Sequence, residues 1–330
     1  YRPFSIRENL TKTELVPNQK VLVRLVSFTG AADPVADVVE VIGEAGVHRT
    51  EMNAIVMEHG FRTEFPAEVA REAQEIEQNH ASIIAAEARV RADYREVTTM
   101  TIDPVDAKDF DDALSLRPLE NGEYEVGIHI ADATFFVRPG TALDDEAVRR
   151  GTSVYLVDAT IPMLPHELSG NVCSLRADED RLAFSAVFRM NMQGHVLDRR
   201  FEKSIIRSNK RFTYEEAQAV LDAEAGPYAE ELLTLRTIAR AMRKSREHEG
   251  AIDFGDNEVK FVLDENGVPL GVVRKERIET NTLIEEFMLL ANREVARHVT
   301  QLAEKVPEHG MVFLYRIHDE PKEDRIDELA

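Results

Sequence analysis

The chain has 330 residues, 43% hydrophobic and 31% charged, which is typical of a soluble globular protein with two or three domains. One cysteine, Cys173, excludes an internal disulfide framework and a cysteine zinc site, and no apolar run is long enough to span a membrane. The formal net charge of −21 argues against non-specific adhesion to nucleic acid, but it permits a nucleic-acid enzyme with a local, metal-lined phosphate channel.

Residues 1–65 are predicted to form short strands. Period-two alternation marks residues 20–28, and two further apolar runs, 37–42 and 53–57, follow after turn residues. These strands suit part of a small β-barrel, although they are too few to close one. Pro66 is typical of a first helical turn, so residues 66–95 are predicted to be a helical connector whose helix reaches about Arg91.

Residues 96–330 have the pattern of an α+β domain, a mixed or antiparallel sheet flanked by long helices. Three dipeptides are typical of hairpin turns: Asn121-Gly122, Gln193-Gly194 and Asn266-Gly267. Two long helices are predicted at 230–246 and 283–302 from their apolar spacing, and residues 311–317 are strand-like.

The segment Thr101–Ala113 is the main chemical signal, because it holds five aspartates between two apolar runs: Asp103, Asp106, Asp109, Asp111 and Asp112. Close carboxylates repel one another and cannot be buried unpaired. The usual remedy is a hard divalent cation, Mg²⁺ or Mn²⁺, with oxygen ligands at about 2.1 Å. A solvated acidic turn is the alternative. An EF-hand is excluded, because a loop starting at Asp103 places Val105 and Ala107 at ligand positions.

A basic stretch, Arg199–Arg211, carries six Lys or Arg residues against Glu202 alone. It suits either a solvated strand face or a local phosphate channel. Its composition does not distinguish these two possibilities.

Several further segments follow in a characteristic order and spacing: Arg91–Arg95, the acidic segment, His129–Asp132, Gly151–Leu156, Ile161–Pro165, Leu168–Leu175, Arg181–Ser185, Ser204–Ser208, Thr213-Tyr214, Leu283–Phe287 and Tyr315–Pro321. Together they resemble the catalytic RNB domain of the ribonuclease II / ribonuclease R family of exoribonucleases. The resemblance covers about residues 91–330, so residues 96–330 are expected to be the N-terminal portion of an RNB domain. Residues 1–65 resemble, less strongly, part of the family's OB-like second cold-shock domain.

The resemblance implies a metal-dependent, processive 3′→5′ exoribonuclease that hydrolyses single-stranded RNA to nucleoside 5′-monophosphates by two-metal phosphoryl transfer. Asp103, Asp109 and Asp112 match the positions of metal ligands for Mg²⁺ or Mn²⁺. Asp111 matches the position closest to the cleavage step, so all four are expected to be catalytic. Asp106 matches no ligand and is interpreted as a turn residue.

The resemblance also implies contacts with RNA. Tyr155 and Phe254 match positions that clamp the last base at the 3′ end, and Tyr214 matches one that stacks further up the channel. Glu285 matches a carboxylate near the terminal ribose. Each aromatic ring has a structural alternative in the protein core, and Glu285 has one in a capping box with Thr282.

Two other functions remain open. A catalytically inactive, RNA-binding regulatory protein could use an RNB scaffold, although the complete aspartate set speaks against it. An unrelated metal phosphatase or DNA nuclease would turn over DNA or monoesters without needing a 2′-hydroxyl. The expected partner is the 3′ end of single-stranded RNA, with neither a membrane nor a dinucleotide cofactor. The first 20 residues have no signal-peptide core, which predicts a cytoplasmic location.

The end of the chain departs from the family pattern. The family's later arginine-containing segment, which contacts phosphates near the scissile bond, and its S1 domain do not occur in these residues. We therefore expect residues 1–330 alone to bind RNA weakly and to cleave it poorly.

Overall fold

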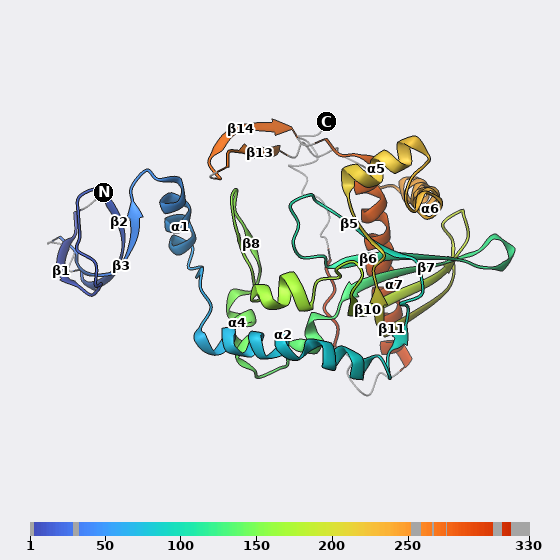
Figure 1. Ribbon diagram of the computed structural model, residues 1–330, viewed down its shortest axis with the longest axis horizontal. Helices are drawn as coiled ribbons and strands as arrows, with labels where there is room; N and C mark the ends of the chain where they lie inside the picture. The colour runs from blue at the N-terminus through green and yellow to red at the C-terminus, as the bar shows by residue number, and fades with distance from the viewer. Residues whose placement is uncertain are drawn as a thin grey trace. The chain divides into compact units, whose positions relative to one another are not determined.

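The computed structural model describes residues 3–28, 33–251, 259–265, 267–274, 276–305 and 312–317 (Figure 1). The chain forms two compact units, each built from separate stretches of sequence. The first unit comprises Tyr1–His80, Ala133–Val172 and Asp256–Glu276. The second comprises Ala81–Asp132, Cys173–Gly255 and Arg277–Ala330.

The first unit begins with a three-stranded sheet in the order β1-β3-β2, formed by β1 (Ser5–Asn9), β2 (Gln19–Ser27) and β3 (Val35–Glu44). The strands predicted at 20–28 and 37–42 are thus confirmed. The strand predicted at 53–57 is wrong, because these residues belong to helix α1 (His48–Glu58). Met52, Ile55 and Val56 recur at helical spacing, and a short apolar run alone does not separate helix from strand.

Helix α2 (Ala67–Glu87) follows, and the Pro66 carbonyl accepts its first intrahelical hydrogen bond, from Ala70 N–H at 3.0 Å. The predicted helix is confirmed with a slightly earlier end. Its last residues pass into the second unit. The first unit also contains α3 (Ala133–Phe136), α4 (Ala142–Arg150), η2 (Leu168–Val172) and the strand pair β8 (Val154–Tyr155) and β9 (Thr160–Ile161).

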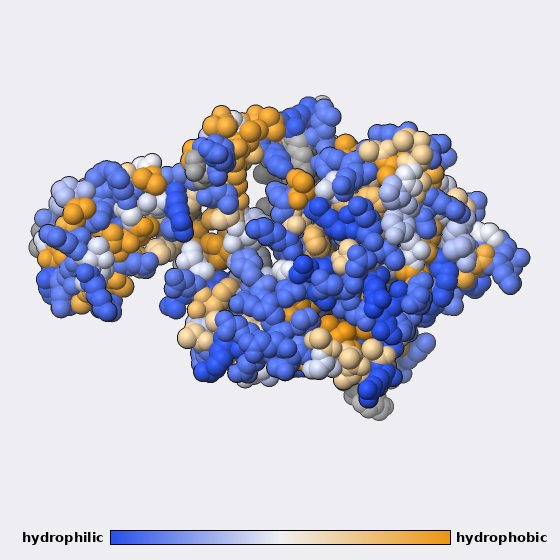
Figure 2. Space-filling view, viewed as in Figure 1, coloured by the Kyte–Doolittle hydropathy of each residue, from blue (hydrophilic) through white to orange (hydrophobic). Residues whose placement is uncertain are grey.

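A second hairpin of the first unit pairs β13 (Val259–Leu263) with β14 (Pro269–Arg274). Its predicted turn includes Asn266, which lies outside the described residues, and Gly267 has a φ of 80°. Large apolar side chains of both strands are exposed, and Figure 2 shows hydrophobic residues gathered over this hairpin. They include Val259, Phe261, Leu270 and Val272.

The second unit is built on a seven-stranded sheet in the order β12-β5-β6-β7-β10-β11-β4. Its strands are β4 (Ala92–Asp93), β5 (Thr99–Asp103), β6 (Asp112–Pro118), β7 (Tyr124–Ala131), β10 (Asp180–Met190), β11 (Val196–Arg207) and β12 (Lys210–Thr213). The strands from β5 to β11 pair antiparallel, whereas β12 and β4 pair parallel to their neighbours. The predicted mixed sheet is therefore confirmed.

The predicted hairpin turns join these strands. Asn121 and Gly122 both have positive φ, 61° and 72°, within η1 (Glu120–Gly122), as a type I′ turn requires. Gly194, with a φ of 76°, turns β10 into β11. These turns align successive strands and thereby set the register of the sheet.

Three helices pack on one face of this sheet: α5 (Tyr214–Ala223), α6 (Ala229–His248) and α7 (Glu279–Lys305). The core between them contains Met100, Leu114, Ile128 and Phe188 from the sheet and Leu221, Leu235, Ile238 and Phe287 from the helices. Both predicted long helices are confirmed. The capping box predicted at Thr282 and Glu285 is wrong, because α7 already begins at Glu279 and Thr282 lies within its first turn. The strand predicted at 311–317 is also wrong over its described part, since residues 312–317 form no strand.

The opposite face of the sheet carries a buried polar chain. His129 Nε2 is hydrogen-bonded to Ser115 Oγ at 2.8 Å, and its Nδ1 to Ser185 Oγ at 2.6 Å. Ser185 in turn is hydrogen-bonded to Ser204 at 2.5 Å, so the chain crosses β6, β7, β10 and β11. Burial lowers the pKa of His129 to about 3, which keeps the imidazole neutral. Within the described residues no helix combines the length and apolarity that a membrane crossing needs.

Candidate active site

The acidic segment joins two neighbouring antiparallel strands in the second unit. All five residues of β5 are buried, and the strand ends at Asp103. The strand β6 begins at Asp112 and pairs antiparallel with β5, so the two aspartates lie at the same end of the sheet. Residues 104–111 between them contain no helix or strand. The strands thus hold Asp103 and Asp112 on rigid elements and leave Asp109 and Asp111 on the connection.

Two side chains from distant segments hold this connection. Ser174 Oγ accepts a hydrogen bond from the Phe110 N–H at 3.0 Å, and the Leu175 N–H donates to the Phe110 carbonyl at 2.8 Å. Arg211 donates to the carbonyl oxygens of Pro104 at 2.6 Å and Val105 at 3.2 Å. The Arg211 guanidinium also lies 5.4 Å from the centre of the Phe110 ring. Both ends of the connection are therefore tied to the body of the second unit.

The carboxylates of the acidic segment are partly desolvated. Asp103 is 7% exposed, and its burial, with Asp112 and Asp111 nearby, raises its pKa to about 7. Burial and the charge of Asp111 raise the pKa of Asp112 to about 6. Asp111 is at the surface, yet incomplete hydration and the neighbouring Asp109 also raise its pKa. These four aspartates are therefore close enough to repel one another.

Tyr214 joins the same site from another element. It is the first residue of α5 and follows Thr213, which is paired in register with Asp103 across β12 and β5. Burial, with the charges of Asp112 and Asp103, raises the pKa of Tyr214 to about 12. The phenol therefore stays protonated beside the carboxylates at neutral pH.

The donor chemistry fits a divalent cation. All candidate donors are hard carboxylate oxygens, and Asp103 Oδ2 is buried without a hydrogen-bond partner among the described residues. A cation would satisfy this atom and offset both the desolvation and the mutual repulsion that raise the three pKa values. Among the residues that the structure describes, however, no three His, Cys, Asp or Glu side chains are gathered as a preformed metal shell. The complete shell would need side-chain rotation or further ligands.

The other predicted site residues fall in different places. Tyr155 lies on β8 in the first unit and is 68% exposed, as a side chain available for stacking would be. Glu285 is exposed on α7 in the second unit and forms an ion pair with Arg277. Phe254 lies outside the described residues. Asp106 is exposed on the connection.

Three of the four arginines of the basic stretch form ion pairs, two of them within the sheet and one with helix α7. Arg199 pairs with Glu294, Arg200 with Glu125 and Glu202, and Arg207 with Asp180. These contacts make most of the stretch a salt-bridged strand surface, whereas Arg211 at its end reaches the acidic segment. Sequence reasoning did not connect Ser174 or Arg211 to the aspartates. One feature of the sequence could have placed Arg211 near the site, because it lies three residues before the predicted site residue Tyr214.

Comparison with known proteins agrees with these features. Residues 91–330 match the RNB domain family, and residues 2–66 match the cold shock domain family. The chain is 38% identical to ribonuclease R of Thermotoga maritima over 323 residues, covering 95% of this chain and 44% of that protein. It is 39% identical to the human exosome complex exonuclease RRP44, covering 82% of this chain and 28% of that protein. The chain thus spans less than half the length of these curated relatives.

Solved structures show the same fold. A structure of Mycoplasma genitalium RNase R in complex with ribose-methylated single-stranded RNA aligns with a TM-score of 0.83 at 22% identity, covering 99% of this chain and 50% of that chain. The yeast pseudonuclease Ssd1 aligns with a TM-score of 0.62 at 17% identity, covering 89% of this chain and 36% of that chain. The RNB match extends over most of the chain and begins just before the acidic segment, so this chain belongs to the RNB family of ribonucleases, as its motifs predicted.

Proposed function

We propose that the protein is a metal-dependent exoribonuclease that hydrolyses single-stranded RNA processively from the 3′ end to nucleoside 5′-monophosphates. One observation carries this proposal: Asp103, Asp111 and Asp112 lie near one another at the end of β5 and the start of β6, and burial and mutual repulsion raise their pKa values. Crowded, desolvated carboxylates are unfavourable for stability alone, and they are what a cation-dependent phosphodiesterase needs.

Asp103, Asp109 and Asp112 would hold Mg²⁺ or Mn²⁺. When bound, the cation supplies Lewis-acid stabilisation of the charge that develops on the phosphate. Asp103 and Asp112 are positioned by their strands, whereas Asp109 is adjacent to Phe110, whose backbone is fixed by Ser174. The chain therefore presents two ligands from rigid strands and a third from an anchored connection.

Asp111 has a different role in this proposal. Its side chain is exposed, and its backbone carbonyl accepts a hydrogen bond from the Ala131 N–H at 2.9 Å, which fixes the residue beside β7. The exposed carboxylate would accept a hydrogen bond from the attacking water and orient it towards the phosphorus. Tyr214, protonated beside these groups, would stack on a base or donate to a phosphate oxygen.

RNA recognition would rest on aromatic stacking and on one carboxylate. Tyr155 and Phe254 would clamp the terminal base, and Glu285 would accept a hydrogen bond from the terminal ribose. Two structures of Mycoplasma genitalium RNase R contain single-stranded and double-stranded RNA, respectively, which supports RNA as the substrate class.

A second function is favoured by one specific observation. The fold of the chain is shared by yeast Ssd1, a pseudonuclease, so an RNB scaffold can exist without nuclease activity. An inactive RNA-binding protein would bind the same single strands and release no product.

The direction and chemistry of cleavage test the proposal. Full-length protein is incubated with poly(A) labelled at either the 5′ or the 3′ end, with Mg²⁺, Mn²⁺ or EDTA. We expect 3′-labelled RNA to release labelled 5′-AMP at once, whereas 5′-labelled RNA loses its label last. Equal release from both ends, or hydrolysis of the matching DNA, would contradict the proposal. RNA binding without any product would favour the pseudonuclease function.

A further inference from the structure

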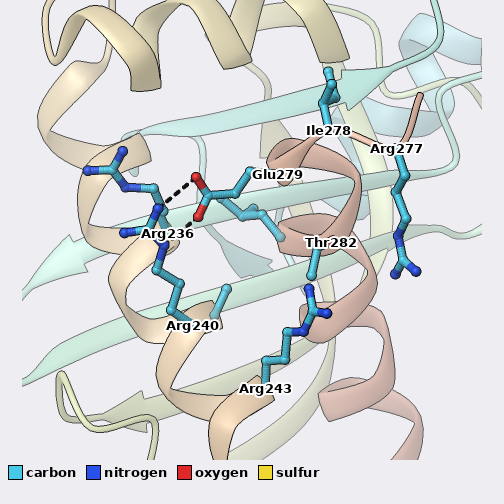
Figure 3. A pocket seen from close by; sticks show the side chains of 9 residues that line it. Arg236, Arg240, Arg243, Arg277, Ile278, Glu279 and Thr282 are labelled. Carbon is cyan, nitrogen blue, oxygen red and sulfur yellow. Dashed lines mark hydrogen bonds and ion pairs between the residues drawn. The ribbon is translucent and has the colours of Figure 1, made fainter. Parts of the chain in front are cut away.

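A basic pocket of about 410 Å³ lies between α6 and the start of α7 in the second unit. Arg236, Arg240 and Arg243 line it from successive turns of α6, and Arg277 and Glu279 line it from the other side (Figure 3). Spacings of three and four residues place the three α6 arginines on one helix face. Four cationic side chains thus line one pocket in a protein whose formal net charge is −21.

The pocket also has an apolar part. Ala239, Ile278 and Leu283 line it together with the arginines. Two backbone donors at the start of α7 are already satisfied: the Thr280 N–H donates to Gln218 Oε1 at 3.1 Å, and the Asn281 N–H donates to the Ile278 carbonyl at 3.1 Å. The guanidinium groups are therefore the donors that a ligand would meet.

Each arginine forms an ion pair with a glutamate, but most of these glutamates have exposed side chains. Among the described residues that line the pocket, Glu279 is the one acid, and it forms two hydrogen bonds with Arg240. Among the described residues, the other three arginines also pair with glutamates outside the pocket lining whose side chains are between 45% and 69% exposed: Glu224, Glu247 and Glu285. Ion pairs between exposed side chains are weak because water screens them, so an anionic ligand can replace these pairs.

Arg236 adds a second observation. Its Nη1 donates to the Leu221 carbonyl at 3.1 Å and its Nη2 to Glu224 Oε1 at 3.2 Å. Its Nε is buried and has no acceptor among the described residues. An unsatisfied buried donor on an arginine is unfavourable, and a ligand oxygen or a water molecule would satisfy it.

We propose that this pocket binds the phosphate group of a nucleotide. Arg236, Arg240 and Arg243 would bind the phosphate oxygens, since planar guanidinium groups match phosphate geometry in a bidentate manner. Ile278 and Leu283 would pack against the sugar or base. The phosphate can come from a free mononucleotide or from an RNA strand, and both sources share this chemistry. The inference goes beyond the proposed function, because it uses none of the four aspartates.

Calorimetric titration in EDTA tests the pocket, because hydrolysis does not occur without the cation and binding is read separately from activity. The probes for the free source are AMP, inorganic phosphate and adenosine. We expect AMP and phosphate to bind and adenosine to bind much more weakly. Arg243→Gln should weaken AMP binding at least about tenfold, the effect of a lost charge-assisted hydrogen bond.

Glu279→Gln should have the opposite effect and tighten AMP binding at least about threefold, because it removes the one lining carboxylate and frees Arg240. The matched control is Arg297→Gln, which removes an exposed α7 arginine paired with Glu294 away from the pocket and should leave binding unchanged. Circular dichroism and thermal unfolding verify that each variant is folded. Opposite changes in two folded variants cannot arise from a general loss of structure.

The probe for the strand source is a five-nucleotide single-stranded RNA, titrated into the same variants. Weaker RNA binding by Arg243→Gln without any AMP binding would assign the pocket to phosphates of an RNA strand. Binding of AMP that follows the predicted pattern would assign it to free nucleotides. If neither AMP nor RNA affinity changes in Arg243→Gln and Glu279→Gln, or if adenosine binds as tightly as AMP, the inference is wrong.

Discussion

Ser174 and Phe110 are 64 positions apart in the sequence, yet the Phe110 N–H donates a hydrogen bond to Ser174 Oγ at 3.0 Å. The next residue, Leu175, donates to the Phe110 carbonyl at 2.8 Å. Both backbone groups of the residue between Asp109 and Asp111 are thus held by one buried segment. The orientation of these two carboxylates depends on that segment as much as on the acidic segment itself.

Replacing Ser174 with alanine should lower the rate of catalysis only by shifting the connection that carries Asp109 and Asp111. The Phe110 N–H would lose its partner, and an unsatisfied buried donor costs about 1–3 kcal/mol, part of which a shift of the connection would relieve. We expect the kcat of RNA hydrolysis to fall at least about tenfold, with RNA affinity changed less than about threefold. The matched control is Ser208→Ala, another buried serine, whose hydroxyl donates to the Lys210 carbonyl at 3.3 Å. Equal kcat in both variants would refute the positioning role of Ser174.

Cation binding should raise the free energy of unfolding of the protein. At pH 7.5 an ionised Asp103 in its buried position is destabilising, because its folded-state pKa of about 7 lies well above its ordinary value. Asp103→Asn should therefore be about 1–2 kcal/mol more stable than the wild type in EDTA. Addition of Mg²⁺ or Mn²⁺ at ten times its dissociation constant should stabilise the wild type by about 1.4 kcal/mol and the variant by much less.

Chemical denaturation in EDTA and in metal decides this prediction, with K⁺ at matched ionic strength as the control for screening. Equal stabilisation of wild type and Asp103→Asn by the divalent cation would show that Asp103 is not a ligand.

His129 predicts an acid dependence of stability. Its folded-state pKa of about 3 lies below its ordinary value of 6.5, so the unfolded chain binds the extra proton between these values. The stability from the neutral imidazole is complete above about pH 6.5 and falls by about 1.4 kcal/mol per pH unit as the pH decreases. The stability advantage of wild type over His129→Gln should thus shrink by about 2 kcal/mol between pH 7.5 and pH 5.

Urea unfolding of both proteins at these two pH values measures that change. The control is His195→Gln, which replaces an exposed histidine with the same amide side chain. An advantage of the wild type that grows as the pH falls would mean that His129 is charged in the fold.

We expect the ring of Tyr155 to stack on one base of the RNA. Tyr155→Ala should lower affinity for short single-stranded RNA by about 1–3 kcal/mol, whereas Tyr155→Phe keeps the ring and should bind like the wild type. Metal-dependent stabilisation should be unchanged in both. Fluorescence anisotropy with labelled RNA gives the affinities, and equal binding by all three proteins would assign Tyr155 a structural role instead.

The sequence predicted local features well. Features that depend on residues close together in the chain were predicted correctly. They are the aspartates at the end of one strand and the start of the next, the Asn121-Gly122 turn, and the long helices α6 and α7. The error at residues 53–57 has a local cause too, because a short apolar run fits either a strand or the helix α1.

Contacts between distant residues were not predictable in the same way. Ser174 and Arg211 look ordinary in the sequence. Arg211 reaches the acidic segment because β12 pairs with β5, whereas Ser174 lies on irregular backbone after η2 and is placed there by tertiary packing. The α6 arginines share a helix face by spacing, but that they line one pocket with Arg277 depends on how α6 and α7 pack. The capping box at Thr282 failed for a related reason, since packing extends α7 by a turn beyond its local signals.

The most direct test of the proposed nuclease activity uses the Asp111→Asn variant of the full-length protein. Single-turnover hydrolysis of labelled RNA gives its rate, and a binding titration gives its RNA affinity. The amide keeps the size of the side chain and removes its charge, so we predict a rate loss of at least about 10³-fold, or about 4 kcal/mol in the barrier. RNA affinity should change less than about threefold, and Asp106→Asn, an exposed aspartate of the same segment, should cleave like the wild type. Unchanged rate and affinity in Asp111→Asn would show that the acidic segment is not the active site.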